Sequence, residues 1–202
     1  MRYEMAVFLD GVPAVTEDEN DETTIQMCYE TLFAYCYEQK RAIDTIVIDG
    51  ESVDIGSFSK YYNVKLKDIK RLDFLTIDQA GLFAKLVNLG KGFVEVADRL
   101  ETISSLMNSG KDDEAVMILQ TASVMTHYLL MTHRFFDLFE LPLQYPVGDS
   151  NIVEYKEKIN PLLNALIDAY QAKDIVEFSD LAEYELAPVL RELGEGLQNL
   201  IN

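Results

Sequence analysis

The sequence has no tryptophan, two cysteines, two histidines and only 17 basic residues against 35 acidic ones, so its formal net charge is −18 at pH 7. A chain of this charge repels phosphate backbones and anionic lipid headgroups, and we therefore predict no nucleic-acid partner. A charged protein partner should instead present a basic face. Acidic residues outnumber basic ones on both sides of Asp78, so the charge belongs to the whole surface rather than to a tail.

The two cysteines, Cys28 and Cys36, fall on one predicted helix. Their separation along a helix is about 12 Å, whereas the Cα atoms of a disulfide lie within about 7 Å. We therefore predict that they form no intramolecular disulfide. The first residues, Met1 to Met5, lack the apolar core of a signal sequence, and together these features favour a reducing cytoplasm.

The two histidines exclude one common class of helical metalloprotein. Carboxylate-bridged di-iron bundles need two Glu-x-x-His pairs, but Val124 and Leu130 stand three residues before His127 and His133. The bulky apolar residues that follow His127 disfavour a phosphotransfer role. The sequence shows no Cys–His metal set, no glycine-rich phosphate loop and no Ser–His–Asp pattern. We predict a non-enzymatic protein without a metal or another cofactor.

Long hydrophobic runs are also scarce, and the one candidate membrane span is the uncharged stretch from Ala115 to His133. Its length is sufficient to cross a bilayer. Polar residues interrupt it at Gln120, Thr121, Ser123, Thr126, His127, Thr132 and His133. Their summed insertion cost is too high for a lone span, so we predict a buried helix of a soluble protein and no membrane span.

The dominant positive feature is a change of hydrophobic period near Asp78. Before it, apolar residues alternate in short runs, as in strands; after it, they recur at intervals of three and four, as in helices. The first part predicts one helix over 23–41 and strands over 3–9, 12–15, 42–48, 51–55 and 72–77. By analogy of element order, this suits a small β-grasp-like module, as in ubiquitin-like proteins, with a split α+β sandwich as the alternative.

The second part predicts four helices, over 78–108, 112–140, 151–172 and 174–201. Two of their three connections are short, which favours antiparallel neighbours and an up-down four-helix bundle. Pro161 and Pro188 should each kink or restart a helix, because proline lacks the backbone N–H donor. The predicted fold class is thus α+β, with a β-grasp-like domain over 1–77 and a four-helix bundle over 78–202.

The second predicted helix has more apolar residues than one face of a bundle can absorb. They cover most of its circumference, so the helix is either wrapped centrally or shared with another subunit. An exposed patch of this kind would mark a protein-binding surface. We predict an adaptor or assembly protein that forms a homo-oligomer, with an interface containing Met125, Tyr128, Met131, Phe135, Leu143 and Tyr145.

Glu185 is an oddly placed carboxylate. It falls in the apolar stripe of Phe178, Ala182 and Val189 on the last predicted helix, or at its boundary if the register shifts by one residue. Within the stripe it would have to be paired, protonated or at an interface, because burying an unpaired carboxylate is costly. A buried polar site of Glu185, His133 and Tyr184 would give the alternative function, a ligand-binding or enzymatic bundle.

The segment that contains this glutamate reads Asp-Ile-Val-Glu-Phe-Ser-Asp-Leu-Ala-Glu-Tyr-Glu-Leu-Ala-Pro-Val-Leu over residues 174–190. It resembles a segment of uncharacterised, acidic helical proteins of bacteria, which share an aspartate and then Asp-Leu-x-Glu-Tyr-Glu-Leu-x-Pro. The resemblance implies a bacterial source and no activity. It also marks Glu183, Tyr184, Glu185 and Pro188 as built-in features of the bundle.

Overall fold

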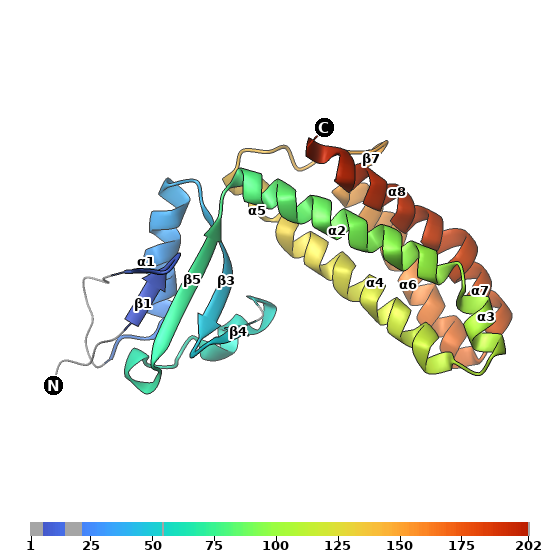
Figure 1. Ribbon diagram of the computed structural model, residues 1–202, viewed down its shortest axis with the longest axis horizontal. Helices are drawn as coiled ribbons and strands as arrows, with labels where there is room; N and C mark the ends of the chain where they lie inside the picture. Colours follow the sequence, from blue (N-terminus) through green and yellow to red (C-terminus); the bar gives the residue numbers. More distant parts are fainter. Residues whose placement is uncertain (1–5, 15–21, 54, 202) are drawn as a thin grey trace. The chain divides into compact units, whose positions relative to one another are not determined.

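The computed structural model describes residues 6–14, 22–53 and 55–201 of the chain. The chain divides into two compact units, Met1–Ala80 and Gly81–Asn202, where the sequence predicted a division after residue 77. The first unit contains a mixed sheet and the second consists mainly of helices (Figure 1). The fold class is therefore α+β, as predicted.

The sheet of the N-terminal unit has five strands in the order β2-β1-β5-β3-β4. β1 runs parallel to β5, and the other neighbours are antiparallel. The predicted strands are longer than β1, β2 and β4. Residues 3–5, 15 and 54 lie outside the described part of the chain, but Ala14 is not in a strand and Ile55 begins a 3-10 helix, so the predicted strand ends there are wrong. The bounds are β1 (Ala6–Leu9), β2 (Val12–Pro13), β3 (Ala42–Ile48), β4 (Glu51–Val53) and β5 (Arg71–Ile77).

Both hairpins of this sheet turn at an Asp-Gly pair. The φ angles are 52° and 78° at Asp10 and Gly11, and 52° and 91° at Asp49 and Gly50. Two successive residues with positive φ are typical of the type I′ turn, whose twist matches that of the paired strands. The Asp49 carboxylate also accepts the backbone N–H of Arg71 at 2.8 Å, which ties the second turn to the start of β5.

One helix, α1 (Ile25–Glu38), lies against the sheet (Figure 1). The Thr24 side chain caps it by accepting the backbone N–H of Met27. The buried residues of α1 recur at three and four, and they pack with the inward side chains of β1, β3 and β5: Ile25, Cys28, Leu32 and Cys36 meet Val7, Ile43, Ile46, Leu72 and Phe74. Two short 3-10 helices, Ile55–Tyr61 and Leu66–Asp68, connect β4 to β5.

The C-terminal unit has four helical segments in chain order, and three of them are divided. The first is α2 (Gln79–Leu100) with α3 (Ile103–Asn108), and the second is α4 (Asp112–His133) with α5 (Phe135–Leu138). After the short hairpin of β6 (Pro146–Val147) and β7 (Ser150–Asn151) comes α6 (Ile152–Ala172). The last comprises α7 (Ile175–Asp180), a π-helix (Leu181–Leu186), α8 (Ala187–Gln198) and a terminal 3-10 turn (Asn199–Ile201).

The two helix-internal prolines have different effects. α6 continues through Pro161, so the helix does not restart there. Before Pro188 the helix widens into the π form, in which the backbone N–H of Ala187 donates to the carbonyl of Ala182, five residues earlier. Pro188 cannot donate to the carbonyl of Tyr184 and its ring crowds that oxygen, and the π geometry relieves this conflict.

Helices α2 and α8 approach each other at two glycines. A Cβ atom on Gly90 would lie 2.6 Å from the carbonyl oxygen of Gly194, and a Cβ atom on Gly194 would lie 2.7 Å from that of Gly90. Only glycine permits this contact between backbones. The core of the helical unit contains Phe93, Phe136, Tyr155, Phe178, Leu190 and Leu197, all fully buried.

Candidate functional site

Two reactive side chains, Cys36 and Tyr155, are buried. Among the described residues, no group of three or more His, Cys, Asp or Glu side chains could hold a metal ion. Burial raises the pKa of the Cys36 thiol, which disfavours the reactive thiolate. Tyr155 is fully buried and donates its hydroxyl to Glu192 at 2.9 Å, joining α6 to α8. Burial, and then the adjacent Glu192 carboxylate, raises the pKa of Tyr155.

The expectation that Glu185 lies in the buried stripe of the last helix is wrong. Glu185 is exposed, and Leu186 is buried in its place. The π-helix explains the difference, because its wider turn accommodates one extra residue and rotates the following positions. The stripe moves from Glu185 and Val189 to Leu186 and Leu190, which is the one-residue shift considered from the sequence.

His133 and Tyr184 do not join Glu185 in a buried polar site. Tyr184 is 71% exposed and lines the same surface hollow as Glu185. His133 is half-buried at the end of α4, where its Nε2 lies 3.0 Å from the carbonyl oxygen of Leu143 and its ring packs edge-on against Phe136. Figure 1 shows α5, which follows His133, and α7 at opposite ends of the helical unit. The alternative function thus lacks the site on which it depended.

Four of the six residues predicted at an interface are half-buried: Met125, Met131, Phe135 and Tyr145. The Tyr145 ring packs against Phe83 and Phe136, with 5.6 and 6.0 Å between ring centroids. The Met125 side chain covers Gly92 of α2, since a Cβ there would lie 2.6 Å from its Cε. The other two, Tyr128 and Leu143, are 43% and 61% exposed.

Between Asp113 and Arg134, one side of α4 is exposed to solvent and carries no charged residue. We call it the α4 face, and it consists of Met117, Gln120, Ser123, Val124, His127 and Tyr128. Met117 and Val124, absent from the predicted interface, are 57% and 67% exposed. Lys85 of α2 lies at the edge of this face, where its Nζ donates a hydrogen bond of 2.9 Å to the Tyr128 hydroxyl. The exposed apolar surface that the sequence indicated is therefore centred on Val124.

By length and composition alone, the described segment Asp112–Leu138 is apolar enough to cross a membrane, because an 18-residue window within it has a mean hydropathy of 1.3. In the structure 33% of that apolar window is buried. The absence of a membrane span stays a prediction from the polar residues within the segment.

A second exposed surface surrounds the turn between α6 and α7. Lys173 ends α6 with a φ of 59°, in the left-handed region. Asp174 then caps α7, because its carboxylate accepts the backbone N–H of Glu177 at 3.0 Å. The turn leaves the first two side chains of α7 in solvent, with Ile175 47% and Val176 72% exposed.

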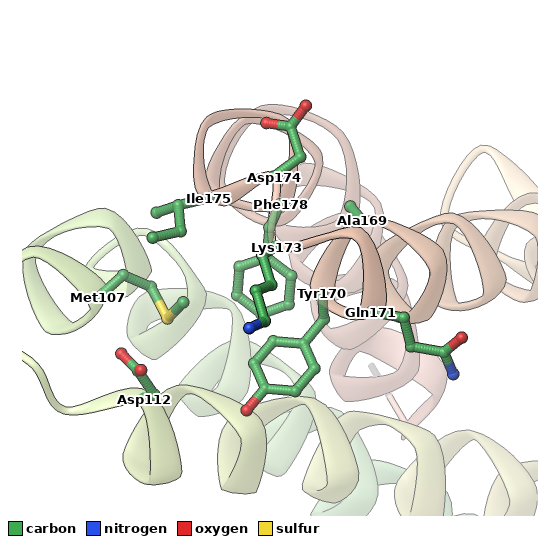
Figure 2. Close-up of a pocket in the computed structure, with 9 residues that line it drawn as sticks. All are labelled: Met107, Asp112, Ala169, Tyr170, Gln171, Lys173, Asp174, Ile175 and Phe178. Atoms are coloured by element: carbon green, nitrogen blue, oxygen red, sulfur yellow. The ribbon is translucent and has the colours of Figure 1, made fainter.

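Two hollows flank this turn and share Asp174. The first has a volume of about 520 Å³ and is lined by Met107, Asp112, Ala169, Tyr170, Gln171, Lys173, Asp174, Ile175 and Phe178 (Figure 2). The rings of Tyr170 and Phe178 are in contact, with 5.6 Å between centroids. Figure 2 shows the Lys173 amine pointing into the hollow. The first hollow thus combines an aromatic pair with one ammonium group.

The second hollow, of about 570 Å³, is bordered by the π-helix and is lined by Asp174, Val176, Glu177, Asp180, Leu181, Tyr184 and Glu185. Within the described chain, the carboxylates of Glu177, Asp180 and Glu185 form no ion pair with a basic side chain. We call Ile175, Val176 and Tyr184, together with the carboxylates of Asp174, Glu177, Asp180 and Glu185, the corner surface. It lies within the segment whose resemblance to bacterial proteins was noted from the sequence.

Comparisons with known proteins find one family model that matches within the helical unit and another that matches the N-terminal unit. A family model described as a domain of unknown function, DUF8042, matches residues 90–196, more than half of the chain. The chain belongs to the DUF8042 family. The DUF8042 match lies within the helical unit and includes both the α4 face and the corner surface. A second model, the TP0873 N-terminal domain, matches residues 5–78.

One relative with an overall match is described as an uncharacterized protein of Treponema pallidum (strain Nichols). It is 24% identical over 179 residues, which is 89% of this DUF8042 chain and 90% of the relative. No solved structure matches the chain.

Proposed function

We propose that the chain is a non-enzymatic interaction protein of the bacterial cytoplasm, an adaptor or assembly factor that self-associates through the α4 face. One observation carries this proposal: Met117, Val124 and Tyr128 are exposed on an uncharged helix face, although the chain has a net charge of −18. Exposed apolar side chains that gather on one face are typical of association surfaces.

Burial of apolar surface supplies the driving force. A large aliphatic side chain that passes from full exposure to full burial contributes about 1.5–3 kcal/mol, and these three side chains are already partly covered. In an isologous interface, two copies pack through the same face, so each of these three side chains is buried once in each copy. Since association also costs translational and side-chain freedom, we expect a dimer of micromolar rather than nanomolar affinity.

Electrostatics determine which face two copies can share. Acidic surfaces that approach within the Debye length, about 8 Å at physiological salt, repel each other. Contact through the α4 face brings uncharged residues together and avoids direct juxtaposition of like charges. The hydrogen bond from Lys85 fixes the Tyr128 hydroxyl before association, which lowers the entropic cost.

We also propose the finer description of the two units, a β-grasp-like module and an up-down four-helix bundle. The strand order with its parallel β1–β5 pair, and the single helix α1 against the sheet, support the first. The four successive helical segments, with α4 against α6 and α6 against α8, support the second. These architectures alone assign no activity.

Substitutions on the α4 face test the proposed self-association. Val124→Glu places a carboxylate in the dimer interface, and we expect the dissociation constant measured by sedimentation equilibrium to rise at least about tenfold. Ile167→Glu is the matched control, because Ile167 is a 52% exposed apolar residue on α6. The control should dimerise like the wild type, and equal weakening by both substitutions would contradict the assignment of the interface.

A lipid bilayer is the rival occupant of this face. Flotation of the full chain with vesicles of neutral phospholipid distinguishes the two. We expect the protein to stay with the soluble fraction. If the wild type and Ile167→Glu float with the vesicles but Val124→Glu does not, a membrane covers the α4 face. That result would overturn the proposed dimer.

A further inference from the structure

We propose that the corner surface is a docking site for a basic, amphipathic segment of a different protein. This site is separate from the α4 face and goes beyond self-association. It combines exposed apolar side chains, two adjoining hollows and a rim of carboxylates on a rigid base.

Val176 and Tyr184 provide the apolar contact. At 72% and 71%, their exposed fractions are the highest among the large hydrophobic residues of the described chain. Both line the second hollow, so a single partner segment can cover them together. Removing this apolar surface from water favours association.

The carboxylates around these side chains determine the charge of the partner. Asp174, Glu177, Asp180 and Glu185 line the second hollow, while Lys173 is the one base that lines either hollow. An acidic segment is repelled there, as is a second copy meeting the chain by the same surface; lysine and arginine are attracted. An arginine can pair with a carboxylate and also stack on the exposed Tyr184 ring.

The first hollow offers a place for an apolar anchor of the same segment. Its aromatic pair, Tyr170 and Phe178, is flanked by Met107, whose flexible thioether adapts to different side chains. Anchors seated in such pockets dominate the energetics of many protein interfaces. Because the two hollows share Asp174, one segment can place an apolar residue in the first and basic residues over the second.

The base under the corner surface is held rigidly. Phe178, Ala182 and Leu186 are fully buried beneath it. From the π-helix, Glu183 accepts the backbone N–H of Ser104 at 2.7 Å and fixes this segment to α3. A prearranged surface loses less conformational entropy on binding, and π-helical turns are frequent at functional sites.

A synthetic peptide can test this site in the full chain. The probe is a fluorescent amphipathic peptide of arginine, leucine and phenylalanine, and its control has glutamate in place of arginine. Fluorescence anisotropy should show binding of the first peptide and none of the second. Val176→Ser with Tyr184→Ser should weaken binding about tenfold, without a change in circular dichroism because both side chains are exposed. Unchanged affinity in this double variant would overturn the proposal.

Matched charge reversals separate local docking from general attraction to an acidic protein. We compare two double variants. The first combines Glu177→Lys with Asp180→Lys, and the second combines Glu95→Lys with Glu157→Lys. Both change the net charge equally, and all four residues are exposed. Docking predicts about a tenfold loss of peptide affinity in the first pair and less than about twofold in the second. Equal losses would mean diffuse attraction and would overturn the proposal.

Two further measurements identify the occupant. Peptide binding that persists in Val124→Glu shows that the corner surface works without the α4 face. If Glu177→Lys with Asp180→Lys abolishes self-association of the chain, the occupant is a second copy and the proposal of a foreign segment is overturned.

Discussion

Glu183 accepts a hydrogen bond at 2.7 Å from the backbone N–H of Ser104, 79 positions away in the sequence. Ser104 lies in the first turn of α3, where backbone N–H groups have no partner within the helix. Thr102, directly before α3, does not cap it, because its hydroxyl donates to the carbonyl of Arg99. The π-helix therefore supplies a cap that α3 lacks locally.

Replacement of Glu183 tests this cap. Glu183→Ala leaves the Ser104 N–H without its acceptor, and we expect the free energy of unfolding to fall by about 1–2 kcal/mol. Glu183→Gln keeps an acceptor oxygen and should lose less. Urea denaturation measures both, with Glu185→Ala as the neighbouring exposed control, expected within about 0.5 kcal/mol of the wild type. Equal destabilisation by Glu183→Ala and Glu185→Ala would contradict the assigned role of Glu183.

The Tyr155–Glu192 pair predicts a stability loss at alkaline pH. Burial and the adjacent Glu192 raise the pKa of Tyr155 in the folded chain above the ordinary tyrosine value of about 10, so the unfolded chain releases this proton first. The contribution to stability is complete below pH 10 and declines as the pH rises toward the folded pKa. Between about pH 9 and pH 12, the free energy of unfolding should fall more steeply in the wild type than in Tyr155→Phe. Parallel curves for the two proteins would contradict the raised pKa.

The contact of α2 with α8 predicts contrasting effects of two glycine substitutions. Gly194→Ala would place a Cβ atom 2.7 Å from the backbone oxygen of Gly90, and we expect a loss of about 1–3 kcal/mol or more. Gly92→Ala meets only the flexible end of Met125, and alanine also favours helix, so its effect should be smaller. Thermal unfolding of both variants gives the comparison. A lower melting temperature for Gly92→Ala than for Gly194→Ala would contradict the close approach.

Much of the secondary structure could be predicted because hydrophobic period depends on local geometry. The alternation in 42–48 and the Asp-Gly pairs at 10–11 and 49–50 correspond to β3 and the two hairpin turns. The π-helix could not be predicted in the same way. Pro188 indicates a disturbance, but whether the chain kinks, restarts or widens depends on the tertiary packing around it.

The candidate surfaces were harder to locate, because neighbouring residues on a helix point 100° apart and a shift of one residue exchanges their roles. On α4 the apolar excess is visible in the sequence, yet Val124 is exposed while the adjacent Met125 packs over Gly92. Within the π-helix, Glu183 points inward to α3 and Glu185 faces solvent. The sequence thus singled out Glu185 and Tyr184 and left Glu185 either in the buried stripe or at its boundary, whereas the structure exposes both side chains.

The salt dependence of the oligomeric state tests the central claim most directly. Sedimentation equilibrium of the full chain should show a monomer–dimer equilibrium that shifts toward dimer as sodium chloride is added. Salt screens the repulsion between two chains of charge −18, and it leaves the apolar contact of the α4 faces in place. A monomer at every concentration and salt level, or a dimer that salt dissociates, would contradict self-association through the α4 face.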